Sequence, residues 1–178
     1  NDIYPGSDSS FPTMLTNLSG TLFFQANNGL TSTELWKATL GPTIALSSKS
    51  QPIVGGAPPS PFNGTDFGTT LIGQPRISIY TITNTGEGGL TLTGTPAVAV
   101  SGAAAGDFQV TQLPATSIAQ SSSSTFQITF TASTIGLRSA MVSIASNDSE
   151  TPFTFAVQGT GATELPATIP LFLPLVIR

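Results

Sequence analysis

The chain has 178 residues, an apolar share of 39%, a charged share of only 8% and a net charge of −4 at pH 7. This length suits one or two small domains with a real core, and five basic residues are too few for the Lys/Arg patch that nucleic acid requires. Because the chain has neither Cys nor His, disulfides, thiol chemistry, Ser-His-Asp catalysis and His-ligated zinc are excluded.

The low charged share allows two interpretations. Ordinary soluble domains carry about 25% charged residues, whereas Ser, Thr, Gly and Asn fill that role here. Such a surface repels its own copies weakly, which favours close packing between subunits. The alternative is a secreted domain whose hydroxyl groups carry sugar. Residues 1–5 do not look like a signal peptide, so we expect the chain to be the C-terminal part of a longer precursor.

Residues 1–50 are predicted to form a small antiparallel meander of four strands near 11–18, 21–26, 33–40 and 43–48. Asn28-Gly29 is a strong hairpin signal between the second and third strands. A sheet of this size buries too little area to be stable alone, so we expect it to dock onto something. Residues 51–64 then form a semi-stiff Pro/Gly linker, whose positions 52–54 are compatible with a short strand.

Residues 65–161 are predicted to form an immunoglobulin-like β-sandwich. Phe126–Phe130 and Ala140–Ile144 alternate apolar and polar residues, as half-buried strands do. Residues 97–105 are compatible with either a short strand or a packed loop. The predicted fold class is therefore all-β, a sandwich preceded by a small meander. Seven strands are expected near 66–69, 76–84, 90–95, 108–112, 124–130, 136–146 and 153–159.

The N-terminal unit resembles a known bacterial repeat. Asp2–Ser10, Leu15–Phe24 and Glu34–Lys37 look like one copy of the ELWxxDGT repeat of large bacterial surface proteins. The family pattern continues as Ser-Asp-Gly-Thr, whereas this chain has Ala38–Gly41. That departure suits a degenerate repeat at the end of an array.

The second unit resembles the bacterial choice-of-anchor D domain, which is similar to the ASPM/SPD-2/Hydin (ASH) immunoglobulin-like group. The resemblance implies a binding or spacer module of extracellular or cell-surface bacterial proteins, often beside a C-terminal anchor, and it implies no catalysis. The residues that carry it are Asp66–Gly68, Tyr80–Gly86, Asp107–Phe108, Phe126–Thr131, Gly136–Ile144, Asn147–Asp148 and Gly159–Gly161.

No constellation predicts an enzyme, a cofactor or a metal site. Most acidic residues fall at predicted turns or strand starts, where Asp caps backbone groups. Asn147–Glu150 is an oxygen cluster that calcium could use, but a plain turn is the favoured interpretation. Trp36 with Tyr4, Phe23 and Phe24 suits core packing better than sugar stacking. Glycans remain partners that the sequence allows, with N-glycosylation patterns at Asn17, Asn63 and Asn147.

Residues 162–178 form an apolar tail that is too short to cross a bilayer. Ile169–Ile177 has nine residues, against about 20 for a spanning helix, and Pro170 and Pro174 exclude a regular helix. The tail resembles a short Leu-Pro-Leu-Val ending of secreted bacterial proteins, which implies a sorting or anchoring signal. It could also fold back onto its own domain, or add a strand to a neighbouring subunit.

We therefore predict a non-catalytic extracellular structural protein, a self-assembling filament or surface-layer subunit that uses its tail as an inter-subunit strand. The alternative function is a monomeric cell-surface adhesion or carbohydrate-binding module of a larger secreted protein. The predicted interface residues are Ile169, Leu171, Phe172, Leu173, Leu175, Val176 and Ile177.

Overall fold

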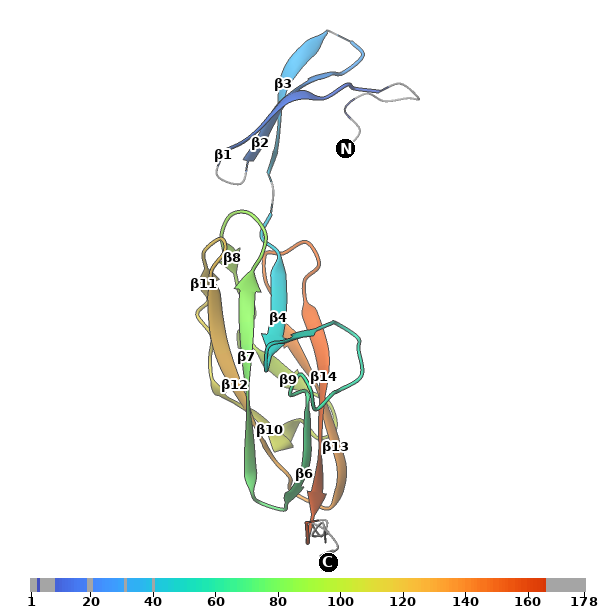
Figure 1. Ribbon diagram of the computed structural model, residues 1–178, viewed down its shortest axis with the longest axis vertical. Helices are drawn as coiled ribbons and strands as arrows, with labels where there is room; N and C mark the ends of the chain where they lie inside the picture. Colours follow the sequence, from blue (N-terminus) through green and yellow to red (C-terminus); the bar gives the residue numbers. More distant parts are fainter. Residues whose placement is uncertain (1–2, 4–8, 19–20, 31, 40, 166–178) are drawn as a thin grey trace, which may run out of the picture.

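The computed structural model describes residues 3, 9–18, 21–30, 32–39 and 41–165. The N-terminal part is an antiparallel sheet of three strands in the order β1 (Thr13–Leu18), β2 (Thr21–Asn27) and β3 (Thr33–Thr39). The predicted Asn28-Gly29 hairpin is confirmed, because Gly29 adopts a φ of 79° in the β2–β3 connection. Figure 1 shows this sheet at one end of the molecule, clear of the sandwich.

The fourth predicted strand belongs to the sandwich, so its assignment to the N-terminal meander was wrong. β4 (Ile44–Ser48) pairs with β7 (Pro75–Asn84) and forms a hairpin with β5 (Gln51–Ile53). The physical reason is burial, since Ile44, Leu46 and Ser48 alternate into the sandwich. The boundary drawn at residue 50 therefore falls inside a hairpin, while the short strand expected near 52–54 is confirmed in part.

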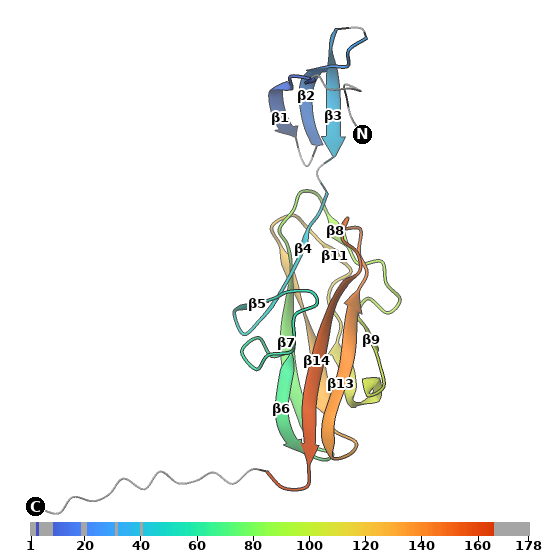
Figure 2. The same cartoon turned by 90° about the vertical axis from the view of Figure 1, so that its right-hand side faces the viewer.

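Two β-sheets form the sandwich, in the strand orders β10-β12-β7-β4-β5 and β6-β14-β13-β9, and β8 and β11 make a small third sheet. Figure 2 shows β13 and β14 running side by side down its length. The all-β fold with an immunoglobulin-like sandwich is thus confirmed, and residues 97–105 contain a strand. The remaining elements are β6 (Asp66–Leu71), β8 (Leu90–Thr91), β9 (Ala99–Ser101), the 3-10 helix η1 (Ala105–Asp107), β10 (Phe108–Gln112), β11 (Ser117–Ile118), β12 (Ser123–Thr131), β13 (Gly136–Ile144) and β14 (Phe153–Ala162).

The core of the sandwich is dense and aromatic. Phe126, Ile128 and Phe130 of β12 are fully buried and alternate with less buried polar residues, as predicted. Tyr80 stacks on Phe126 with ring centroids 5.1 Å apart. A Cβ placed on Gly159 of β14 would collide with the Phe130 ring of β12, which belongs to the facing sheet. The two sheets therefore approach so closely that β14 needs glycine at this position.

The chain enters and leaves the sandwich at opposite ends. Ile44, at the start of β4, pairs with Asn84 at the last position of β7. Ala162, at the last position of β14, pairs with Leu71, just before the turn into β7. We call the first end proximal and the second distal. They are separated by about 30 Å, the length of a ten-residue strand such as β7.

Candidate interaction surfaces

The predicted interface residues of the tail lie outside the described residues. The structure does define where the tail starts, because β14 ends at Ala162 at the distal end. There the Ile72 N–H donates to the Ala162 carbonyl at 3.0 Å. The involvement of residues 169–177 in an interface therefore stays a prediction.

Asp148 holds the chain where it enters the sandwich. Its buried carboxylate accepts the Ile44 N–H at 2.7 Å and the Glu150 N–H at 3.1 Å. Burial raises the pKa of this carboxyl, but the hydrogen bonds from Ile44, Glu150 and Ser149 outweigh that effect and the pKa lies below its ordinary value. Because backbone N–H groups occupy these oxygens, the cluster at residues 147–150 is a structural turn, as the favoured interpretation predicted.

Asn84 also organises the proximal end, and the sequence predicts no role for it beyond its place in the Tyr80–Gly86 segment of the family resemblance. Its fully buried amide oxygen accepts the N–H groups of Thr43 and Gly86, at 3.3 and 3.2 Å. Its amide nitrogen donates to the carbonyls of Gly88 and Ile118. One side chain thus ties the start of β4 to two loops. A buried Asn can do so because it offers both donors and acceptors.

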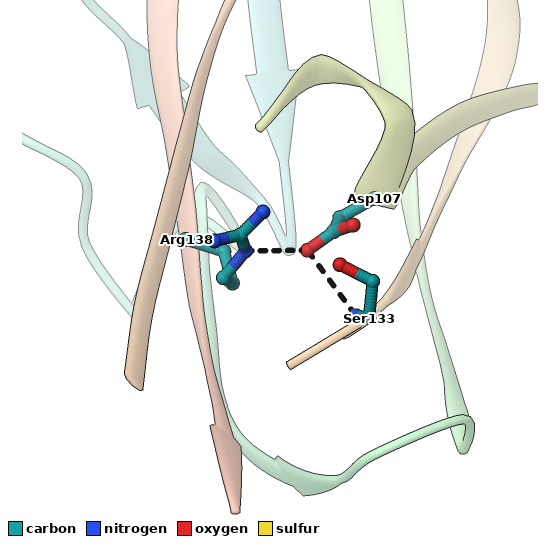
Figure 3. Close-up of polar contacts among 3 residues, drawn as sticks. All are labelled: Asp107, Ser133 and Arg138. Atoms are coloured by element: carbon teal, nitrogen blue, oxygen red, sulfur yellow. Dashed lines mark hydrogen bonds and ion pairs between the residues drawn. The ribbon is translucent and has the colours of Figure 1, made fainter. Parts of the chain in front are cut away.

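An ion pair fastens η1 to β13, as Figure 3 shows. The Arg138 Nε donates to Asp107 Oδ2 at 2.6 Å, and the Ser133 N–H donates to the same oxygen at 3.3 Å. Burial raises the pKa of the Asp107 carboxyl. The bonds from Arg138 and Ser133 lower this pKa by more than burial raises it, so the pKa lies below its ordinary value. This cluster joins η1, the turn that holds Ser133 and strand β13, so its role is structural.

Among the described residues, the N-terminal sheet is exposed along its outer strands, whereas β2 is half-buried and its Ala26 is fully buried. Every residue of β1 is exposed, and Met14 and Leu35 are 74% and 72% accessible. Trp36 is only half-buried, and its indole N–H donates to the Ala26 carbonyl at 3.2 Å. The predicted closed core around Trp36 is therefore absent from the described part of this sheet. Apolar surface of this extent is typical of an interaction site.

A cleft of about 500 Å³ opens between the β4–β5 hairpin and the start of β14. Ile53, Val54 and Phe153 give it apolar walls, and Glu150 lies at its lining. Among the described residues, no three acidic side chains gather as a metal site would require. None of these residues forms a helix long and apolar enough to span a bilayer.

Two of the N-glycosylation patterns carry Asn side chains that already serve the fold. Asn63 Oδ1 accepts the Thr65 hydroxyl at 2.7 Å. Asn147 Oδ1 accepts the Thr91 N–H at 2.8 Å, and its amide donates to the Gly89 carbonyl at 3.1 Å. A glycan on the Asn147 Nδ2 would replace one of the two hydrogens of the group that donates to the Gly89 carbonyl.

Residues 61–160 match the model of the HYDIN/CFA65/VesB-like, Ig-like domain family. The chain belongs to this family. The match covers the sandwich from β6 to most of β14 and leaves out β4 and β5. It includes Asn84, Asp107 and Asp148, whose side chains bond neighbouring segments. The finer assignments, to the choice-of-anchor D domain and the ELWxxDGT repeat, remain predictions. No curated protein matches the chain.

Solved structures resemble this Ig-like chain only distantly. A Porphyromonas gingivalis W83 protein of unknown function is 17% identical with a TM-score of 0.48, and the match covers 79% of this chain and 63% of that one. The human CEP192 ASH/PapD-like domain 7 is 16% identical over 57% of this chain and 81% of its own, with a TM-score of 0.40. The Vibrio cholerae VesB protease is 16% identical with a TM-score of 0.41, over 54% of this chain and 29% of the protease.

Proposed function

We infer that this protein is a non-catalytic, extracellular structural subunit that assembles with its own copies through the C-terminal tail. The observation that carries the proposal is the placement of the chain ends. β4 starts at the proximal end of the sandwich, whereas β14 delivers the tail at the distal end. A tail at one end, and at the other a sheet whose described residues leave much apolar surface exposed, suit a head-to-tail, heterologous contact, which builds a ring or an open filament.

The composition of the tail supports an assembly role. Burial of tail side chains would contribute on the order of 10 kcal/mol before ordering costs, counted over Leu171, Phe172, Leu173, Leu175, Val176 and Ile177. The core of the described sandwich is built from residues between Ile44 and Val157. The weakly charged surface adds little repulsion between copies, and the resemblance to the choice-of-anchor D domain implies a spacer or binding role in surface proteins.

Deleting residues 166–178 tests this function. Negative-stain electron microscopy and size-exclusion chromatography should show that the intact chain forms polymers and the shortened chain a soluble monomer. The matched control is a full-length chain with Leu171→Asp and Leu175→Asp, which keeps the length and should also stay monomeric. Polymers of unchanged length in the deletion variant would reject the proposal.

Trp36 favours a second candidate function, a carbohydrate-binding module. Its half-buried ring leaves part of one surface open to a ligand. Its indole N–H is already bonded to Ala26, so the ring could offer a sugar stacking but no hydrogen bond. A glycan array with intact chain and Trp36→Ala would decide, since this function requires binding that the variant loses.

A further inference from the structure

The outer edge of β3 is a regular, open strand edge. β3 pairs with β2 over seven residues, from Thr33 to Thr39, without a register shift. Within the described residues no strand pairs with its other side. The opposite edge of the sheet is different, because β1 is interrupted by a shift between Thr13 and Thr16. Such bulges hinder the addition of a further strand, so β3 is the better acceptor of the two.

Hydrogen bonds in β2 determine which β3 groups face outward. The Asn27 N–H donates to the Ser10 carbonyl at 2.9 Å, on the β1 side of β2. Backbone groups alternate along a strand, so those of Ala26 face β3, where the Ala26 carbonyl also accepts the Trp36 indole N–H. Ala26 and Phe24 lie opposite Glu34 and Trp36, whose backbone groups therefore face β2. The groups that face outward belong to Thr33, Leu35 and Lys37.

The tail has the pattern of a strand that pairs on one side only. Pro170 and Pro174 are four residues apart, and N–H groups of residues two or four apart point to the same edge of an extended strand. Both missing N–H groups therefore fall on one edge. The other edge keeps all its donors and acceptors. That complete edge belongs to Ile169, Leu171, Leu173, Leu175 and Ile177.

The tail of the same chain cannot occupy this edge over its full length. It leaves β14 at Ala162, at the distal end. Ile169 lies seven positions after Ala162, and this stretch of chain spans at most about 25 Å. The sandwich alone is about 30 Å long, and β3 lies beyond its proximal end (Figure 1). Ile169 can therefore meet β3 only in a second copy.

We propose that residues 169–177 of one copy add a fourth strand to the N-terminal sheet of the next copy, along the outer edge of β3. This inference rests on the proposed function and names the surface that receives the tail. The complete edge of the tail bonds the backbone groups of Thr33, Leu35 and Lys37. Tail side chains lie beside Leu35 on one face of the sheet and beside Trp36 on the other. The contact joins distal to proximal ends, so it repeats into an open filament.

Trp36 reports on this contact, because it is the only tryptophan of the chain and sits next to the proposed strand. A peptide of residues 166–178 is titrated into the chain that ends at Leu165, whose described core lies between Ile44 and Val157. Binding should shift the Trp36 emission to shorter wavelength. A peptide with Leu171→Asp and Leu175→Asp is the control and should cause no shift. Peptide binding, seen by calorimetry, without a change in emission would overturn the proposal.

Leu35→Pro in the full-length chain is the second test. It removes an outward N–H that β2 does not use, so the sheet can retain its pairing. Loss of this bond and the clash of the ring should weaken polymerisation by roughly tenfold or more. Leu35→Thr is the matched control, which keeps the N–H and should retain most of the assembly. An equal effect of both variants, or none of Leu35→Pro, would contradict the proposal.

The two proposals fail in different ways. If deletion of residues 166–178 abolishes polymers while Leu35→Pro leaves them intact, the tail still drives assembly and this acceptor is wrong. The cleft lined by Ile53 and Phe153 would then be the surface to test. If deletion of the tail leaves polymers intact, the proposed function itself is wrong.

Discussion

The N-terminal sheet is antiparallel and the sandwich is so except for the parallel pair of β6 and β14. Both are rich in aromatic residues, yet they bury those residues to very different degrees. Phe126 and Phe155 of the sandwich are almost fully enclosed, whereas Phe24 and Trp36 of the N-terminal sheet are half-buried. The difference lies in the number of layers. A sheet buries one face only when a second layer covers it, and the sandwich has that layer. Within the described residues, the N-terminal sheet has the apolar composition of a core but no second layer that covers it.

The sharpest test of this difference removes one aromatic ring from each region. Phe126→Ala deletes a fully buried ring that stacks on Tyr80 and should destabilise the sandwich by about 3–5 kcal/mol. Phe24→Ala removes a half-buried ring and should cost under about 1 kcal/mol in the monomer. Urea denaturation of tail-deleted chains measures both values. Similar losses in the two variants would show that the N-terminal sheet is as well packed as the sandwich.

Replacing a glycine with alanine tests how closely β14 packs against the turn between β12 and β13. Gly161→Ala would drive a Cβ into the Thr134 carbonyl oxygen, in the turn between β12 and β13, and backbone must move to admit it. We expect a loss of about 2–3 kcal/mol in the free energy of unfolding. Gly89→Ala is the control, because a Cβ there meets nothing within 4 Å. A thermal melt that does not distinguish the two variants would argue against such close packing.

Acid should act on the sandwich through Asp107 and Asp148. The pKa of both carboxyls is lower in the folded protein than the ordinary value of 3.8. Just below pH 3.8 the unfolded chain binds more protons than the folded chain. The contribution of these two carboxylates to the free energy of unfolding is therefore complete above about pH 5 and is lost as the pH drops through their folded pKa values. Asp148→Asn should cost about 1–2 kcal/mol at pH 7 and flatten this dependence. Denaturation midpoints between pH 2 and 7 measure it.

The smallest effect is expected from apolar residues that are exposed in both regions. Leu18 of β1 and Ile79 of β7 are 64% and 54% accessible. Leu18→Ser and Ile79→Thr should each change the unfolding free energy of the monomer by no more than about 0.5 kcal/mol. A larger loss in Leu18→Ser, seen by differential scanning calorimetry, would mean that β1 packs against part of the molecule in solution.

The sequence could predict the strands of the sandwich because their patterns are local. Phe126–Phe130 and Ala140–Ile144 alternate as half-buried strands must, and the structure buries the predicted side chains. The partner of a strand is less visible. β4 follows β3 closely in the chain, yet it pairs with β7. Its hairpin with β5 turns at Lys49 and Ser50, with φ values of 51° and 59°, and this pair lacks the usual Asn-Gly signature.

The roles of the buried polar side chains of Asn84 and Asp148 were harder to predict than the strands. Asp148 and Asn84 each stood in a stretch that reads as a turn, and nothing local shows that they meet the start of β4. Ile44 and Asp148 are 104 positions apart in the chain. The sequence offered only indirect evidence for the roles of Asn84 and Asp148. Both residues belong to segments that resemble the choice-of-anchor D domain. A short polar residue next to a strand end also often bonds the backbone of another segment.

The opposite placement of the two chain ends also defines how the sandwich would carry a mechanical load. A pull between Ile44 and Ala162 acts along β4 and β14, which each lie beside neighbouring strands in ladders. Ladder hydrogen bonds run across the strands. Tension along the strands therefore loads many of these bonds in shear at the same moment, and they do not break one after another. A thread built from such units would resist stretching through its folded domains.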